Sequence, residues 1–393
     1  MIPLMRNTFL NEKDTKEALS YFIKGAEILS MNVQCASFEI AFAQKQGRNK
    51  AVLFNSGGSA NLALLQALKN LEKIKEGDKI GFSALTWSTN VMPIIQMSCI
   101  PIAIDSEVDT LNVSSEQLIN TLTKNPDLKV LFLTNVLGFV DDIWEIKNIC
   151  DNRGIILIED NCEALGTITK YGLKTGNYGL ASTFSFFVGH HMSTIEGGMV
   201  CTDNNDLMEM LKIVRANGWD RNLSVHQQQK WRERHDIKSE FEAKYTFYDL
   251  GYNLRPTEIT GFLGLTQLKY LDESVKKRET NFLLIEGILN ENNELMSIKH
   301  HHIAQLSPFA IPVICKTSDL QRKYLCRCTD MGIETRPMIA GNIQKQPFYK
   351  KYVKNVAYLP YTDFLHSNSF YCGNYPEMTE NDLNIIKTVL IKN

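Results

Sequence analysis

Short apolar runs alternate with longer helix-like stretches through the first half of the chain. Strands that alternate with helices are typical of a mainly parallel sheet covered by helices on both faces. The pattern therefore predicts an α/β fold with a mainly parallel, mixed sheet. The runs expected as strands are Ala51–Phe54, Lys79–Leu85, Ile100–Asp105, Lys129–Val136, Ile155–Asp160 and Ser182–Phe186.

Polar residues gather where several of these expected strands end. Ligands of such sheets lie beyond the carboxyl ends of the strands, so these polar clusters are expected to face a ligand there. The clusters are Asn55–Asn61, Thr86–Asn90, Asp160–Glu163 and Ser185–Glu196.

The second half of the chain indicates a smaller α/β domain. A helical stretch, Thr257–Asp272, precedes a part that begins near Glu273 and carries a strand-like run, Phe309–Val313. We expect a large domain over residues 1–255, and a linking helix with a small C-terminal domain over residues 256–393. The charged segment Asp220–Lys244 is poor in apolar residues, which predicts a loop or an exposed helix that is either a lid or purely structural.

Composition favours a small-molecule partner. The 393 residues are 44% hydrophobic, enough for a large core, and 42 basic residues nearly balance 44 acidic ones. No strong field therefore favours nucleic acid or an anionic membrane. Met1–Gly25 lacks the apolar centre of a secretory signal, and no run approaches a membrane span, so a cytoplasmic location is expected.

Metal binding is not expected. The nine cysteines lack the spacing of zinc sites or the density of a disulfide scaffold, so we interpret them as reduced thiols. The pair Cys326 and Cys328 has no second pair nearby to complete a ligand set. The run His300–His302 is interpreted as a solvated turn rather than a metal site.

Three of the polar clusters carry residues suited to binding a phosphorylated ring. Asn55–Asn61 places Gly57 and Gly58 between a strand and a helix, where free backbone amides can bind a phosphate, although an ordinary turn has the same pattern. Asp160 at the end of a strand can hold a pyridine nitrogen protonated, or can cap a helix. Trp87 can stack on such a ring or pack in the core.

The stretch from Ser182 to Gly198 is more specific. With the segments above, it resembles the DegT/DnrJ/EryC1/StrS family of sugar-modifying, fold-type-I PLP enzymes. That family carries the pattern Ser-Phe-x-x-x-Lys-x-x-x-x-x-Glu-Gly-Gly, in which the lysine binds the cofactor covalently. Ser185, Phe186 and Glu196–Gly198 are in register, but His190 stands where the lysine belongs. Lysine is absent between Lys174 and Lys212, so a shift in register cannot restore one.

The resemblance covers nearly the whole chain and implies roles for single residues. Matched to the family, Gly57, Gly58 and Ser185 contact the cofactor phosphate, Trp87 stacks on the ring, and Asp160 pairs with the pyridine nitrogen. Glu163 stands where many family members have a glutamine near the ring hydroxyl. Asn253 matches an asparagine that reaches the phosphate of the neighbouring subunit, which implies a homodimer with shared active sites. A surface position before a turn is the alternative for Asn253.

The branch of the family with histidine in place of lysine implies a sugar 3-dehydratase. Its cofactor, PLP or PMP, is bound noncovalently. L-Glutamate donates the amino group, and the C3 hydroxyl of a nucleotide-linked 4-keto-6-deoxy sugar is removed, with GDP as the favoured nucleotide. The product is a 4-keto-3,6-dideoxy sugar, with release of ammonia, as in capsule or O-antigen synthesis. His190 is expected to act as the general base, with the neighbouring His191 as an alternative.

Three residues are expected to contact the substrate, namely Arg221, His226 and Arg336. For Arg336, an ion pair with a structural role is an equal alternative. The rival functions are a PLP-dependent nucleotide-sugar aminotransferase and a noncatalytic PLP-binding paralogue. A related branch that binds an iron-sulfur cluster is not favoured, because the cysteines of the second half lack that branch's spacing.

Overall fold

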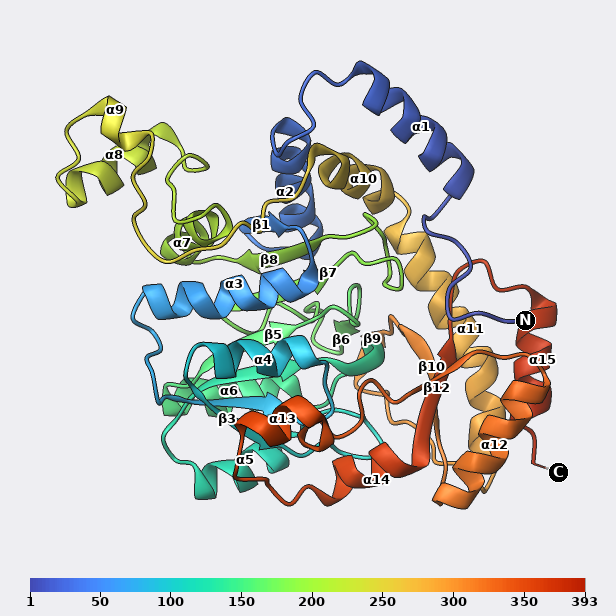
Figure 1. Ribbon diagram of the computed structural model, residues 1–393. Coiled ribbons are helices and arrows are strands. Elements are labelled where there is room, and N and C mark those ends of the chain that lie inside the picture. Colours follow the sequence, from blue (N-terminus) through green and yellow to red (C-terminus); the bar gives the residue numbers. More distant parts are fainter. Residues whose placement is uncertain (393) are drawn as a thin grey trace.

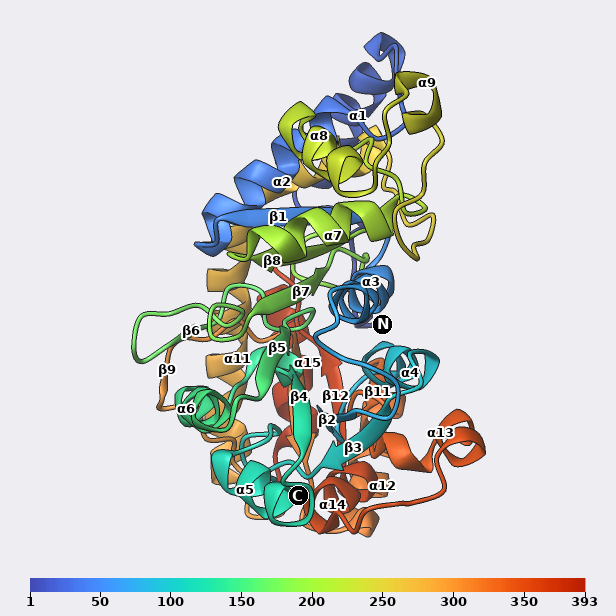
Figure 2. The same cartoon turned by 90° about the vertical axis from the view of Figure 1, so that its left-hand side faces the viewer.

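A seven-stranded mixed sheet forms the larger part of the molecule (Figures 1 and 2). The computed structural model describes residues 1–392. In sheet order the strands are β1 (Lys50–Phe54), β8 (Gly198–Thr202), β7 (Ala181–Ser185), β5 (Ile156–Asp160), β4 (Leu128–Thr134), β2 (Lys79–Ser83) and β3 (Ile100–Ile104). All six expected strands are present, and five of them, β2, β3, β4, β5 and β7, pair in parallel.

Strand β8 was not expected from the sequence, and it is the strand that makes the sheet mixed. It pairs antiparallel with both β1 and β7, with Gly198 opposite Phe54 on one side and opposite Ser185 on the other. A Cβ atom on Gly198 would lie 2.1 Å from the carbonyl oxygen of Ser56. A glycine is therefore required where β8 begins beside the polar cluster that follows β1.

Helices cover both faces of the sheet. One face packs against α3 (Gly57–Asn70), α4 (Ser88–Gln96) and α7 (Asn205–Arg215). The other face packs against α2 (Val33–Gln46), α5 (Ser115–Lys124) and α6 (Ile143–Arg153). Because both faces are buried, the central strands are apolar at successive positions, as in the Leu128–Thr134 run.

A second, three-stranded antiparallel sheet lies in the C-terminal part. Its order is β10 (Ala310–Ile314), β12 (Ser369–Gly373) and β11 (Thr335–Pro337). The helices packed around it are α11 (Leu271–Glu291), α12 (Ser318–Asp330) and α15 (Glu380–Leu390). The long helix α11 runs from the large sheet to this smaller part (Figure 1).

The N-terminus belongs with this smaller sheet. Ile2 is buried in its core, accepts a hydrogen bond from the amide of Glu334 and donates one to the carbonyl of Gly332. The expected helix after residue 256 forms as two helices, α10 (Glu258–Leu268) and α11, and α10 packs on α2. The division at residues 255 and 256 stays a prediction.

The charged segment forms short exposed helices, in agreement with the sequence pattern. These are α8 (Val225–Arg234), which begins with a capping box at Ser224, and α9 (Glu240–Ala243). Both extend away from the sheet at the upper left of Figure 1. Trp231 anchors α8 by donating a hydrogen bond from Nε1 to Glu209, so this segment is partly structural.

The remaining elements are short or peripheral. They are α1 (Glu12–Gly25), η1 (Val136–Gly138), β6 (Ile168–Thr169) paired with β9 (Ile303–Gln305), η2 (Ile343–Lys345), α13 (Pro347–Tyr352) and α14 (Pro360–Asn368). Over residues 1–392, none of the helices is both long and apolar enough to cross a bilayer.

The histidine run is a turn, but only part of it faces solvent. His301 is exposed, while His300 contacts Glu286 at 2.6 Å and the buried His302 contacts the carbonyl of Val140 at 2.6 Å. The interpretation as a solvated turn therefore holds for His301 alone. Cys326 and Cys328 lie two residues apart on α12, one exposed and one buried, so they do not face the same point.

Close packing of α2 on α10 provides a test of this fold. A Cβ atom at Gly261 would lie 2.4 Å from the backbone nitrogen of Cys35. We expect Gly261→Ala to lower the free energy of unfolding by about 1–3 kcal/mol, because the helices must separate. Chemical denaturation measures this change.

Gly287→Ala is the matched control. Gly287 lies inside α11, about one turn before its last residue, and is exposed, and an added Cβ would meet no atom of residues 1–392 within 4 Å. Replacing glycine inside a helix stabilises it by about 0.5–1 kcal/mol. Equal effects of the two substitutions would contradict the packing described for α10.

Candidate active site

A cavity of about 370 Å³ opens where the strands of the large sheet end. Its volume is within the usual range for small-molecule sites. Residues from β5, β7, the starts of α3 and α4, and the C-terminal sheet line it together. Seven residues expected from the sequence are among them: Gly57, Gly58, Trp87, Asp160, Glu163, Ser185 and His190.

The start of α3 forms one end of the cavity. Ser56 caps the helix, because its Oγ accepts a hydrogen bond of 3.0 Å from the amide of Ser59. Gly57 and Gly58 are the first two helical residues, so their N–H groups have no carbonyl partner within the helix. A Cβ atom on Gly57 would lie 2.6 Å from the Cβ of Ser185. Glycine therefore lets a serine hydroxyl lie beside free amides at a helix N-terminus, an arrangement suited to a phosphate.

Asp160 lies at the end of β5 and is almost fully buried. Its Oδ2 accepts hydrogen bonds from the side-chain amides of Asn61 at 3.0 Å and Asn90 at 2.7 Å. Its Oδ1 accepts one of 2.8 Å from the backbone amide of Cys162. Three N–H donors favour the charged form of a buried carboxyl group.

The two asparagines are end residues of the polar clusters Asn55–Asn61 and Thr86–Asn90, which were expected to face a ligand, but neither was assigned a role of its own. Both are buried, Asn61 in α3 and Asn90 in α4, and over residues 1–392 their Oδ1 atoms have no hydrogen-bond partner. The available signal was a polar residue at a buried position of an otherwise apolar helix. Since each Nδ2 is committed to Asp160, each Oδ1 remains an acceptor.

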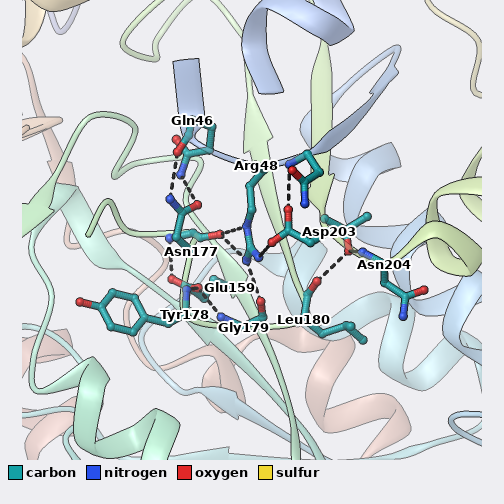
Figure 3. A network of polar contacts seen from close by, with 12 residues as sticks. Gln46, Arg48, Glu159, Asn177, Tyr178, Gly179, Leu180, Asp203 and Asn204 are labelled. Carbon is teal, nitrogen blue, oxygen red and sulfur yellow. Dashed lines mark hydrogen bonds and ion pairs between the residues drawn. The ribbon is translucent and has the colours of Figure 1, made fainter. Parts of the chain in front are cut away.

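Glu159 fixes β5 from the opposite face, because successive side chains of a strand alternate. Its buried carboxylate accepts hydrogen bonds from the backbone amides of Gly176, Tyr178 and Gly179 at 2.6–2.8 Å (Figure 3). Arg48 donates to the carbonyls of Gly176 and Gly179 in the same loop, and pairs with Asp203 at 2.7 Å. Burial raises the pKa of Glu159, while these amides and Arg48 oppose the change.

His190 lies in the loop between β7 and β8 and lines the cavity. Its ring contacts Phe309, with ring centroids 5.3 Å apart. Burial lowers the pKa of His190 to about 4; Asp160 opposes the change and Arg278 adds to it. The imidazole is therefore neutral at pH 7 and able to accept a proton.

His191 has a different environment. It is buried, its Nε2 lies 3.0 Å from the carbonyl oxygen of Ser307, and burial holds its pKa well below the ordinary value. It is not among the cavity-lining residues of the described chain. The geometry therefore favours His190 over His191 as the residue that faces a ligand.

Arg278 of α11 contacts the loop that carries His190. It is fully buried, its Nη1 donates to the carbonyls of Phe309 and Asn374, and its Nη2 donates to the carbonyl of His190 at 3.4 Å. Burial lowers its pKa to about 10, so it stays charged at neutral pH.

The remaining expected residues lie outside the cavity formed by residues 1–392. Arg221 is exposed, stacks over the ring of Trp219 and donates to the carbonyl of Lys244 at 2.8 Å. His226 is exposed at the start of α8. Arg336 pairs with Glu334 at 2.5 Å and lies opposite the cavity residue Tyr371. Asn253 is exposed and bridges to Ala216. Roles for these four in ligand binding stay predictions.

Comparison with known proteins agrees with the resemblance drawn from the motif. The model of the DegT/DnrJ/EryC1/StrS aminotransferase family matches residues 11–390. The chain belongs to this family. This membership confirms the expected recognition and, with the sheet described above, the expected α/β fold class.

Relatives that are named as sugar 3-dehydratases match nearly the whole chain. GDP-4-keto-6-deoxy-D-mannose 3-dehydratase of Escherichia coli O55:H7 is 32% identical, over 93% of this chain and 94% of that protein. The protein of the same name from Yersinia pseudotuberculosis is 30% identical, over 92% of this chain and 93% of that protein. The solved structure of GDP-4-keto-6-deoxymannose-3-dehydratase with a trapped PLP-glutamate geminal diamine has a TM-score of 0.91 at 29% identity. The match covers 99% of this chain and 100% of that chain.

Removal of one asparagine tests the role of the Asp160 cluster. Asn90→Ala deletes a hydrogen bond to a buried carboxylate, an interaction of about 1.5–3 kcal/mol. We expect the affinity for pyridoxal phosphate, the cofactor that the family implies, to fall about tenfold or more. Fluorescence titration of the cofactor-free protein measures the dissociation constant.

Asn148→Ala, on the exposed face of α6, is the control and should leave the dissociation constant unchanged. An unchanged affinity for Asn90→Ala in a correctly folded protein would show that Asp160 does not depend on this donor.

Proposed function

We propose that the protein is a PLP- and PMP-dependent 3-dehydratase of a nucleotide-linked 4-keto-6-deoxy sugar. The observation that carries the proposal is a neutral histidine, His190, in the cavity at the position of the family's lysine. GDP is the proposed nucleotide, because the two relatives named above act on a GDP-linked sugar. The product would serve the synthesis of a surface polysaccharide such as capsule or O-antigen.

The residues of the cavity fit the cofactor. The free amides of Gly57 and Gly58, with Ser185, suit its phosphate, and Asp160 suits a protonated pyridine nitrogen. Trp87 begins α4 at the cavity and is 57% exposed, so its ring is available for stacking. Noncovalent binding is proposed because the cavity-lining residues of the described chain include no lysine.

The cofactor, when bound, would supply the amino group taken from L-glutamate and an electron-withdrawing ring that assists cleavage of the C3–O bond. His190 accepts a proton at an imidazole nitrogen and returns it to the departing hydroxide, which leaves as water. Asp160 would pair with the pyridine nitrogen of the cofactor and so stabilise the electron-poor ring. Phe309 and the buried Arg278 hold the His190 loop in place.

The overall reaction balances without a further reagent. L-Glutamate and the 4-keto-6-deoxy sugar give 2-oxoglutarate, ammonia and the 4-keto-3,6-dideoxy sugar. An aminotransferase of the same fold would give a stable amino sugar and no free ammonia. The cytoplasmic location expected from the sequence stays a prediction.

A product assay tests this proposal. The protein, PLP, L-glutamate and GDP-4-keto-6-deoxymannose are incubated, and ammonia, 2-oxoglutarate and the sugar are quantified by enzymatic assay and mass spectrometry. We expect the three products in equal amounts, with a sugar that has lost one oxygen. A stable amino sugar without ammonia would overturn the proposal in favour of an aminotransferase.

His190→Lys is the diagnostic variant. A lysine at this position should bind PLP covalently, which shifts the cofactor absorbance and allows trapping by borohydride, and dehydration should be lost. The same variant at the neighbouring buried position, His191→Lys, should not trap the cofactor. A noncatalytic paralogue would bind PLP but would not convert it to PMP with glutamate.

We further propose a homodimer whose subunits share active sites through Asn253. Large apolar side chains are exposed on the segment that precedes it, with Phe241 81%, Tyr245 69% and Leu250 69% accessible. Exposed apolar side chains of this size favour a protein-protein contact. Asn253 itself is exposed and is not among the residues of the described chain that line the cavity, which leaves it available to a neighbouring subunit.

Subunit mixing tests the shared site. The variants His190→Asn and Asn253→Ala should each have low activity alone. Mixed dimers regain one intact site, so co-refolded protein should recover roughly a quarter of the wild-type activity. Recovery absent at every mixing ratio, in a protein shown to be dimeric, would contradict the role of Asn253.

A further inference from the structure

Three carboxyl groups lie within five residues at the end of β5, and their hydrogen-bond donors differ. Glu159 accepts three backbone amides, and Asp160 accepts one backbone and two side-chain amides. Glu163 accepts only one hydrogen bond, 2.9 Å from the amide of Leu137 to Oε2. Amide donors favour the charged form of a carboxyl group, so Glu163 is the least favoured of the three to be ionised.

No cation compensates Glu163 within residues 1–392. None of the lysine or arginine ion pairs of this part of the chain includes it. Its Oε1 has no hydrogen-bond partner in the described chain, and the residue lines the cavity. A carboxylate there would lie close to the anionic Asp160, and repulsion between like charges disfavours a second negative charge.

The other titratable groups around the cavity do not supply a positive charge. His190 is neutral at pH 7, and burial raises the pKa of the Cys162 thiol and the Tyr371 phenol, so both stay uncharged. Glu196 is exposed at the rim. The groups that face Glu163 from β5, from β12 and from the loops after β5 and β7 are Asp160, Cys162, His190, Glu196 and Tyr371. Burial, together with Asp160, accordingly raises the pKa of Glu163 to about 8.

We propose that Glu163 works as a neutral carboxylic acid, and that Oε1 donates a hydrogen bond to an oxygen acceptor of the group bound in the cavity. This inference deepens the proposed function, on which its ligand rests. Oε2 accepts the hydrogen bond from the backbone amide of Leu137, a residue with φ of 53°. Oε1 is therefore the oxygen that is left for a ligand. In its neutral form the residue has one donor and one acceptor, the same pair that a glutamine side chain presents.

Glu163 in this form adds a donor to the cavity without adding charge. Asp160 is then the only buried anion that lines the cavity of the described chain, with Glu196 exposed at its rim. Ionisation of Glu163 would replace the donor by an acceptor and would repel an anionic ligand. Binding is therefore expected to need the protonated form, which is lost as the pH rises through about 8.

Infrared difference spectroscopy on the ligand-free full chain tests the protonation directly. In the difference spectrum of wild type minus Glu163→Gln, we expect the carbonyl band of a carboxylic acid at about pH 7. At about pH 9.5 we expect a carboxylate band instead. A carboxylate band at both values would overturn the proposal. This measurement needs neither substrate nor turnover, so it fails or succeeds independently of the dehydratase assignment.

Equilibrium binding of pyridoxamine phosphate tests the hydrogen bond. Below the pKa, Glu163→Gln should bind the cofactor within a fewfold of wild type, because the donor and acceptor are kept. One pH unit above it, the wild-type affinity should be about tenfold lower than that of Glu163→Gln, since only a tenth of Glu163 is protonated. Parallel pH profiles for the two proteins would overturn the role in binding.

Glu163→Ala completes the set. It removes both the donor and the partner of Leu137, and should bind the cofactor more weakly than Glu163→Gln at every pH. If Glu163→Ala bound as tightly as Glu163→Gln, Oε1 would have no ligand to contact, and the proposal would fail.

Discussion

Asp160 must remain ionised while it is buried, and much of the site is arranged around that requirement. An isolated carboxylate in an apolar environment is costly, so it takes a proton unless donors surround it. Here the donors come from α3, α4 and the turn after β5, three segments that meet only in the folded chain. The positions of Asn61 and Asn90 tie both helices to the end of the strand. The same two helices begin at the cavity, so the contact that keeps Asp160 charged also places the phosphate amides and Trp87.

The opposite face of β5 carries a second constraint of the same kind. Glu159 precedes Asp160 and is buried, and its carboxylate accepts hydrogen bonds from backbone amides of residues 176–179 (Figure 3). Arg48 donates to a carbonyl of the same loop. This loop leads into β7, the strand that delivers Ser185 to the cavity. Two adjacent carboxylates thus fix the end of β5 in both directions. A cofactor without a covalent tether depends on such fixed contacts for its orientation.

The sequence predicts the sheet and the centre of the site because both leave local signals. The strands are short apolar runs bounded by polar clusters, and the motif around Ser185 and His190 fixes a register that the family shares. Strand β8 was not expected, because Gly198–Thr202 begins at the last glycine of the Glu196–Gly198 motif and is not separated from it by a turn signal. Asn61 and Asn90 fell in polar clusters of the sequence, but their contact with Asp160 was not predicted and Arg48 was not found, because the partners lie far away in sequence. The pairing of Ile2 with Ile333 has the same cause.

Burial shifts the pKa values of His190 and Glu163, two ionisable groups of the cavity, in opposite directions, and leaves both groups uncharged near pH 7. Desolvation disfavours any charge, so it lowers the pKa of His190 to about 4 and raises that of Glu163 to about 8. Between these values both side chains are neutral, one able to accept a proton and the other able to donate a hydrogen bond. Environments that separate the pKa values of neighbouring groups are how one site provides both a base and an acid near pH 7. A lysine at position 190 would be charged or covalently bound instead. The histidine therefore removes the covalent attachment of the cofactor and also changes the charge of the cavity.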